Sequence, residues 1–142
     1  MELSCKSDFI QRVQFIKEAL SYCKKFKSVG VCQDFYYPTT FDEASLQLDY
    51  FLKEKFENFG TYQDAITKDI KQNFLFHSNI SSSLNIGLID LNELIEKIIN
   101  FDAPYNAKEG FIRQIIGWRE FMLRVYEDDG ILLRNSNFFE FK

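Results

Sequence analysis

The sequence predicts an all-α fold, and three observations support this prediction. Apolar residues recur at alternating intervals of three and four positions in several segments, which places them on one face of a helix. No segment alternates apolar and polar residues for long enough to form a convincing strand, and no Asn-Gly hairpin dipeptide is present. The chain contains only two prolines, so few positions interrupt a helix.

The composition is that of one folded unit. The chain has 142 residues, of which 46% are apolar and 17% aromatic, and this is ample material for a hydrophobic core. Sixteen phenylalanines and seven tyrosines stand against a single tryptophan, so we expect an aromatic interior. There is no internal repeat, low-complexity tract or Gly/Ser linker, and we therefore expect a single helical domain over residues 1–142.

Charge and cysteine content narrow the class of protein. The formal net charge of −4 argues against a general polyanion binder, so any contact with nucleic acid must be local. Cys5, Cys23 and Cys32 form an odd set with no C-x-x-C pair, and this spacing predicts no metal site. With no leader sequence and no apolar run long enough for a bilayer, the expected location is the cytoplasm, without a membrane partner.

The first half of the chain predicts two long helices. One should span about residues 7–27 and end before Gly30. Thr40 and Glu43 have the spacing of a capping box and should begin a second helix. Glycine favours the left-handed cap of a helix, so this helix should end near Gly60. Its expected buried face consists of Phe41, Ala44, Leu48, Phe51 and Leu52.

The second half predicts two short helices and two longer ones. Residues 61–76 should form a short helix and a loop, and residues 77–87 a helix of one or two turns closed by Gly87. Asp90 should cap the next helix. Asn106 and Glu109 have capping-box spacing and should open the last helix. Its apolar stripe is expected at Ile112, Ile115, Ile116 and Met122.

Two segments could carry chemistry. The oxygen-rich helix start from Ser78 to Ser83 could bind phosphate through amides and hydroxyls, or its side chains could cap the helix. The second candidate contains Gly110 and Gly117, each of which costs about 1 kcal/mol in a helix relative to alanine. Close approach of another helix or of a flat ligand would offset that cost.

Trp118 and Arg119 follow these glycines and also have two readings. In the first reading, the indole of Trp118 offers a stacking surface, and the guanidinium of Arg119 beside it can bind phosphate through several N–H donors. The alternative is a tight helix crossing in which Trp118 belongs to the core and Arg119 pairs with a carboxylate.

Four motifs follow one another along about residues 36–126. They are Tyr37-Pro38-Thr39-Thr40, Phe59-Gly60-Thr61-Tyr62-Gln63-Asp64-Ala65, Phe76-His77-Ser78 continuing to Leu84-Asn85-Ile86-Gly87-Leu88, and Glu109-Gly110-Phe111-Ile112-Arg113-Gln114 leading into Gly117-Trp118-Arg119-Glu120-Phe121. In this order and spacing they resemble the photolyase and cryptochrome family, in particular its bacterial iron–sulfur branch. The resemblance matches only the first part of the family's FAD-binding helical domain.

The resemblance implies a flavin site and assigns residues to it. Trp118 would form the wall on which a lesion base stacks, and Gln114 would contact the lesion or the flavin. Arg119 would be a nearby polar anchor. The other FAD contacts implied by the resemblance are Tyr62, His77, Ser78, Ile80, Ser81 and Leu84.

The implied parent activity is light-driven, FAD-dependent repair of pyrimidine lesions in damaged DNA, or blue-light sensing. A full photolyase also has an N-terminal antenna domain, later helices that hold the flavin and, in this branch, four cysteines for a 4Fe–4S cluster. These parts have no counterpart in the sequence, so we expect a photolyase-like fragment without an iron–sulfur cluster, and whether it is an enzyme by itself is left open. Its partner would be the missing remainder of such a chain. The alternative is a non-enzymatic helical module with a vestigial flavin site that binds a partner.

Overall fold

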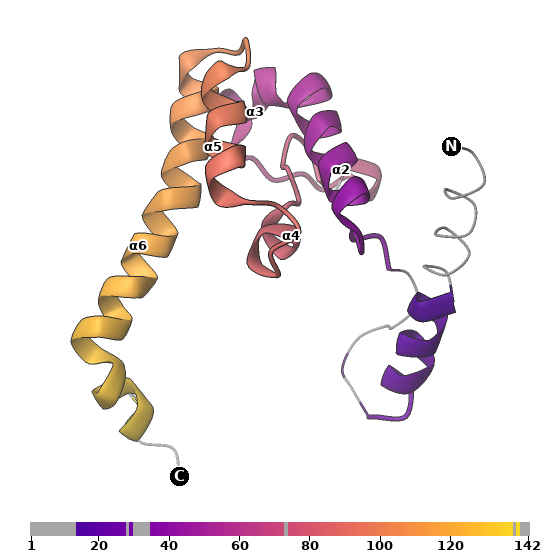
Figure 1. The fold of residues 1–142 in the computed structure, drawn as a ribbon, viewed down its shortest axis with the longest axis vertical. Helices are drawn as coiled ribbons and strands as arrows, with labels where there is room; N and C mark the ends of the chain where they lie inside the picture. Colours follow the sequence, from indigo (N-terminus) through magenta and orange to yellow (C-terminus); the bar gives the residue numbers. More distant parts are fainter. Residues whose placement is uncertain (1–13, 28, 30–34, 73, 138, 140–142) are drawn as a thin grey trace.

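The computed structural model describes residues 14–27, 29, 35–72, 74–137 and 139 (Figure 1). All regular elements in these residues are helical and none is a strand, which confirms the predicted all-α class. Residues 14–23 are helical, so the first helix ends about four residues before the expected end at residue 27. Residues 7–13, where it was expected to begin, and Gly30 lie outside the described residues. The later elements are α2 (Phe41–Glu54), α3 (Phe56–Tyr62), the 3₁₀ turn η1 (Ile70–Gln72), α4 (Ser81–Asn85), α5 (Leu91–Asn100) and α6 (Tyr105–Asn135).

The core lies between α2, α3, α5 and α6 and is rich in phenyl rings, in agreement with the predicted aromatic interior. Phe51, Phe56, Phe59 and Phe111 are buried, and the ring centroid of Phe111 lies 5.0–5.7 Å from those of the other three. Of the predicted buried face of α2, four residues are buried, but Phe41 is exposed. Phe41 is the first residue of α2, where the helix has only begun to pack on the core.

The expected single helix up to Gly60 is wrong, because Lys55 separates α2 from α3. The amide of Lys55 still donates to the carbonyl of Phe51 at 3.0 Å, but its backbone leaves the helical conformation. This break directs both Phe56 and Phe59 into the core. Gly60 lies inside α3 and does not cap it, and a Cβ atom there would come within 2.5 Å of the backbone nitrogen of Ala107. Glycine therefore allows the backbone of α3 to pack on the first turn of α6.

Of the side-chain caps predicted at Thr40, Asp90 and Asn106, the first two are confirmed. The hydroxyl of Thr40 accepts a hydrogen bond from the amide of Glu43 at 3.2 Å, and one carboxylate oxygen of Asp90 accepts from two amides of α5 at 2.8 and 3.0 Å. The predicted box at Asn106 and Glu109 is wrong, since α6 begins at Tyr105 after Pro104 without a side-chain cap. The carboxylate of Glu109 instead bonds to Arg113.

Only the first half of α6 packs on the core, and its second half extends away from it (Figure 1). The buried residues of α6 are Ala107, Gly110, Phe111 and Ile115. The predicted stripe is therefore wrong at Ile116 and Met122, which are exposed, while Ile112 is half-buried. Within the described residues, no helix has the length and the apolar content needed to cross a bilayer.

Candidate functional site

A pocket of about 560 Å³ lies between α4 and the middle of α6. It brings together seven of the nine side chains that the sequence analysis assigned to a site, although they are spread over more than forty positions. These seven are Ser78, Ile80, Ser81, Leu84, Gln114, Trp118 and Arg119, and the other lining residues are Asn85, Phe111, Ile115 and Met122.

The α4 wall is shaped by the backbone that leads into the helix. Asn79 has φ +56°, a left-handed conformation that asparagine adopts more readily than most residues. The next residue, Ile80, is buried in the core cluster and so anchors the start of α4. Ser78 and Ser81, on either side of this anchor, both line the pocket. Gly87, with φ +79°, ends this segment as expected.

The hydroxyls of Ser78 and Ser81 do not cap α4. The N-cap position is occupied by Ile80, and no side chain caps this helix. Neither serine side chain makes a hydrogen bond within the described part of the chain. The sequence left open whether these serines cap the helix or bind a ligand, and in the structure they do not cap it. Both hydroxyls can therefore bind a ligand in the pocket.

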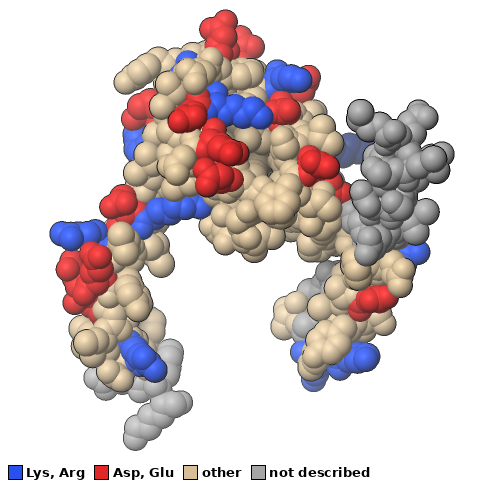
Figure 2. Space-filling model, in the orientation of Figure 1, with Lys and Arg blue, Asp and Glu red and all other residues tan. Residues whose placement is uncertain are grey.

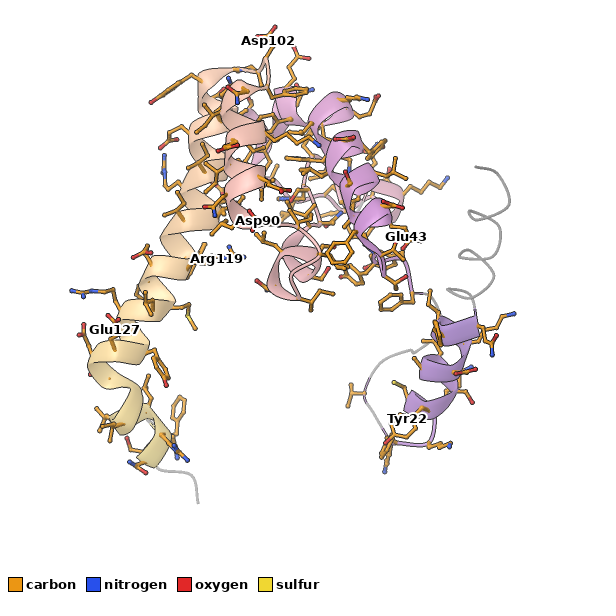
Figure 3. All side chains as sticks on the ribbon, in the orientation of Figure 1. Tyr22, Glu43, Asp90, Asp102, Arg119 and Glu127 are labelled. Atoms are coloured by element: carbon orange, nitrogen blue, oxygen red, sulfur yellow. The ribbon has the colours of Figure 1, made fainter. Side chains whose placement is uncertain are left out.

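Arg119 joins the two walls of the pocket. Its Nη1 donates to the carbonyl of Ile115 at 3.0 Å on its own helix, and its Nη2 donates to Oδ1 of Asn85 on α4 at 3.1 Å. Figure 3 shows Arg119 on the side of α6 that faces α4. A guanidinium has five N–H donors, so Arg119 retains further donors after these two bonds. The expected alternative, a carboxylate partner for Arg119, is wrong because the partner is an amide oxygen.

Trp118 presents its indole to solvent and to the pocket. Its side chain is 66% exposed, and its only ring contact in the described residues is an edge contact with Phe121 at 6.0 Å between centroids. The alternative reading of Trp118 as a core residue is therefore wrong. An exposed indole beside Arg119 provides a flat apolar surface next to a cation, which suits an aromatic ligand that carries negative charge.

Gln114 is held by a residue that the sequence analysis did not assign to the site. Its Nε2 donates to Oε1 of Gln63, at the end of α3, across 3.4 Å. A Cβ atom at Gly110 would lie 2.7 Å from the same oxygen of Gln63, so glycine at 110 leaves room for this side chain. The unfavourable glycine in a helix was the signal that something approaches closely. At Gly117 a Cβ atom would meet no described atom within 4 Å, so its packing explanation finds no support in the described residues.

Two predicted site residues do not line the pocket. Tyr62 stacks on Phe76 with ring centroids 5.2 Å apart, and His77 is half-buried next to Phe76. Asn85, which sequence reasoning missed, stands inside the family-like string but was given no role there. Among the described residues, no group of three His, Cys, Asp or Glu side chains is arranged to hold a metal ion, and Cys5 and Cys32 lie outside them.

Comparison with known proteins gives two relatives. No protein-family model matches the chain. Over 115 residues, 78% of its length, the chain is 39% identical to a (6-4) photolyase of Agrobacterium fabrum. The chain is similar to part of a photolyase. It covers 22% of that photolyase, so the match concerns about a fifth of the larger protein.

The second relative is viral. Over 71 residues the chain is 42% identical to an uncharacterized protein of Acanthamoeba polyphaga mimivirus, and this match spans 46% of the chain and 52% of the viral protein. The chain therefore spans about half of one relative and a much smaller share of the other.

Proposed function

We propose that this chain forms one wall of the FAD site of a photolyase- or cryptochrome-type protein. The observation that carries the proposal is the single pocket that gathers Ser78, Ser81, Gln114, Trp118 and Arg119. The partial match to a (6-4) photolyase supports the same family. In such a protein the bound flavin would supply the electron for light-driven repair of a pyrimidine lesion, or would absorb the light of a blue-light sensor.

The donors of the pocket fit the diphosphate of FAD. Ser78 and Ser81 offer two free hydroxyls from the α4 wall, and Arg119 offers a guanidinium from the α6 wall. Hydrogen bonds from a charged donor to a phosphate oxygen are among the stronger ones in proteins. The bond from Arg119 to Asn85 fixes the guanidinium before the ligand arrives, so less conformational freedom is lost on binding.

The apolar part of the pocket fits a flat ring. Trp118, Leu84 and Met122 line it, and the indole is exposed enough to stack on a base or an isoalloxazine. We assign Trp118 to the stacking of a lesion base flipped out of DNA, and Gln114 to a polar contact with that base or with the flavin. Gln63 would act as a positioning residue for Gln114.

The activity would belong to a larger assembly than the described residues. Among the described residues, the pocket is lined by the segment 78–85 and by α6, and the chain covers 22% of the photolyase that it resembles. A partial pocket must still meet the full entropic cost of immobilising a ligand, so it binds much more weakly than a complete one. We therefore expect little FAD binding by the 142-residue chain alone.

A chimera tests this function directly. Residues 36–126 of this chain would replace the matching segment of the Agrobacterium fabrum (6-4) photolyase, and the purified chimera would be examined for flavin absorbance and lesion binding. We expect the chimera to retain FAD. A folded chimera that is colourless after reconstitution with FAD would refute the proposal.

The second candidate is a non-enzymatic helical module that binds a partner. It is favoured by the many large apolar side chains that α6 exposes beyond the pocket, including Leu132 and Leu133. The same chimera separates the two functions, because a module that has lost its flavin site would give a folded but flavin-free protein.

A further inference from the structure

A second groove, of about 590 Å³, lies between the end of α5 and the first half of α6. We call it the α5–α6 groove. Three isoleucines line it, and of these Ile99 is 55% exposed and Ile116 is 39% exposed. An apolar groove that is open to solvent is typical of a surface that binds another molecule. Its other lining residues are Tyr105, Lys108, Glu109, Ile112, Arg113 and Gly117.

Gly117 and Tyr105 give the two ends of the groove different shapes. Glycine is unfavourable inside a helix, and a Cβ atom at Gly117 would meet no described atom within 4 Å, so no contact in the described part of the chain accounts for this glycine. Tyr105 is the first residue of α6, and its side chain is 82% exposed. The groove therefore has an open space at one end and a large uncovered ring at the other.

Glu109 and Arg113 place opposite charges between these two ends. Nε of Arg113 donates to Oε1 of Glu109 at 2.9 Å, and this ion pair holds both charged groups along the groove. A guanidinium has five N–H donors and a carboxylate about four acceptor sites, so both groups can bind a further partner. Lys108, the remaining charged residue of the lining, donates to the carbonyl of Ile99 at 2.8 Å and is held on the α5 side.

These features are arranged symmetrically along α6. Tyr105 and Gly117 are each six residues from Phe111, and Glu109 and Arg113 are each two residues from it. Residues at every fourth position form one ridge of a helix. When a second copy of α6 lies antiparallel, with a two-fold axis level with Phe111, residues equally distant from this position face each other. The ring of Tyr105 then faces the open space at Gly117 of the other copy, and Glu109 faces the other Arg113.

We propose that the α5–α6 groove is the interface of a symmetric homodimer in which two copies of α6 pack antiparallel. The groove of one copy supplies what the other needs, namely a ring for the open space and a guanidinium for each carboxylate. The facing segment from Tyr105 to Gly117 is about 18 Å long, at roughly 1.5 Å per residue. In Figure 2, acidic and basic side chains are interspersed over the visible face and along α6, so local charge pairs decide how two copies meet.

This inference does not depend on the proposed function. The α5–α6 groove shares no lining residue with the pocket that contains Ser78 and Arg119. Dimer formation would therefore leave the proposed flavin wall uncovered.

Analytical ultracentrifugation of the 142-residue chain measures the association directly. We expect a reversible monomer–dimer equilibrium, in which the mass rises from 16.8 kDa towards twice that value as the concentration increases. Tyr105→Asp should weaken the dimer at least tenfold, because it removes the ring that faces Gly117 of the other copy. An aspartate is favourable in the first turn of a helix, so this variant should remain folded.

Charge reversal tests how the two helices are aligned. Glu109→Arg and Arg113→Glu each place like charges opposite one another in the proposed dimer, so each variant alone should dimerise at least tenfold more weakly. Each variant also loses the ion pair within its own chain. An equimolar mixture of the two variants brings opposite charges together again across the interface, and it should restore association as a heterodimer.

Glu127→Arg is the matched control. It changes the net charge by the same amount as Glu109→Arg and breaks the exposed pair with Arg124 farther along α6, so the affinity of the dimer should change less than twofold. A chain that stays monomeric at all concentrations overturns the inference. So does a dimer that Tyr105→Asp and both reversals leave intact, a mixture that does not associate, or an equal loss in the control. None of these results bears on flavin binding by the chimera, which tests the proposed function separately.

Discussion

Nη2 of Arg119 on α6 lies 3.1 Å from Oδ1 of Asn85 on α4, and this hydrogen bond links the two walls of the candidate flavin pocket directly. Asn85 is the last residue of α4, a helix of five residues. Such a short helix has little stability of its own, so its position depends on contacts with its neighbours. The bond therefore fixes the end of α4 against α6, while buried Ile80 anchors its start.

Removal of this link should loosen α4 without unfolding the core. We expect Asn85→Ala and Arg119→Ala each to lower the free energy of unfolding by about 1 kcal/mol, and a double-mutant cycle to show that the two losses are not additive. Asn100→Ala, at the exposed end of α5, serves as the control. Urea unfolding gives the energies, and hydrogen exchange of the α4 amides should accelerate in both single variants. Additive losses would show that the bond is not formed in solution.

Two glycines in helices should respond in opposite directions to alanine. Gly60→Ala should destabilise the protein by about 1–3 kcal/mol, since its Cβ would meet the backbone of Ala107, which cannot move aside easily. Gly117→Ala should stabilise it by about 0.5–1 kcal/mol, because the site is open and alanine restricts the unfolded chain. Thermal unfolding of the two variants measures both. Stabilisation by Gly60→Ala would contradict the close packing of α3 on α6.

The cap of α5 should contribute measurably to stability. Asp90 accepts hydrogen bonds from the amides of Asn92 and Glu93, so Asp90→Ala should cost about 1–2 kcal/mol in urea unfolding. Asp102 lies at the opposite end of α5 and is exposed (Figure 3), and Asp102→Ala should have an effect below about 0.5 kcal/mol. Equal effects of the two substitutions would argue against the capping geometry.

These cases show which parts of the fold were readable from the sequence. The start of α5 was predicted correctly because its signal is local, an aspartate two and three residues before the amides that it caps. The break at Lys55 was missed because neither glycine nor proline marks it, and it arises from the packing of Phe56 and Phe59. The prediction that Gly60 ends a helix was wrong. Glycine is needed there because α3 packs closely on α6, and no local pattern reveals this tertiary contact.

For the site as well, residues within motifs could be predicted from the sequence, whereas residues that depend on tertiary contacts could not. Seven of the nine residues that the resemblance assigned to a site line one pocket. They could be named from the sequence because the motifs that contain them occur in the family's order along the chain. Gln63 lies inside one of the family-like motifs but was assigned no role, since its contact with Gln114 depends on how α3 meets α6. Met122 was placed on the apolar stripe of the last helix, yet it is exposed. Helical periodicity gives the face on which a residue lies and cannot tell whether another element covers that face.

Trp118 should matter for the lesion more than for the flavin. In the chimera with the Agrobacterium fabrum photolyase, Trp118→Ala should retain most of the FAD and weaken binding of lesion-containing DNA by about 1–3 kcal/mol, the scale of base–aromatic stacking. The side chain is exposed, so folding should be unaffected. Flavin absorbance and a fluorescence binding titration separate the two effects. Loss of FAD with unchanged DNA affinity would reverse the assignment.

The most direct test of the central claim is the FAD affinity of the chimera with and without the two pocket serines. Ser78→Ala combined with Ser81→Ala should weaken FAD binding by about 1–3 kcal/mol, because both free hydroxyls are expected to donate to the diphosphate. Ser45→Ala, an exposed serine of α2 outside this pocket, is the matched control and should leave the affinity unchanged. Equal FAD affinity in the double variant and the parent chimera would contradict the assignment of this pocket to flavin.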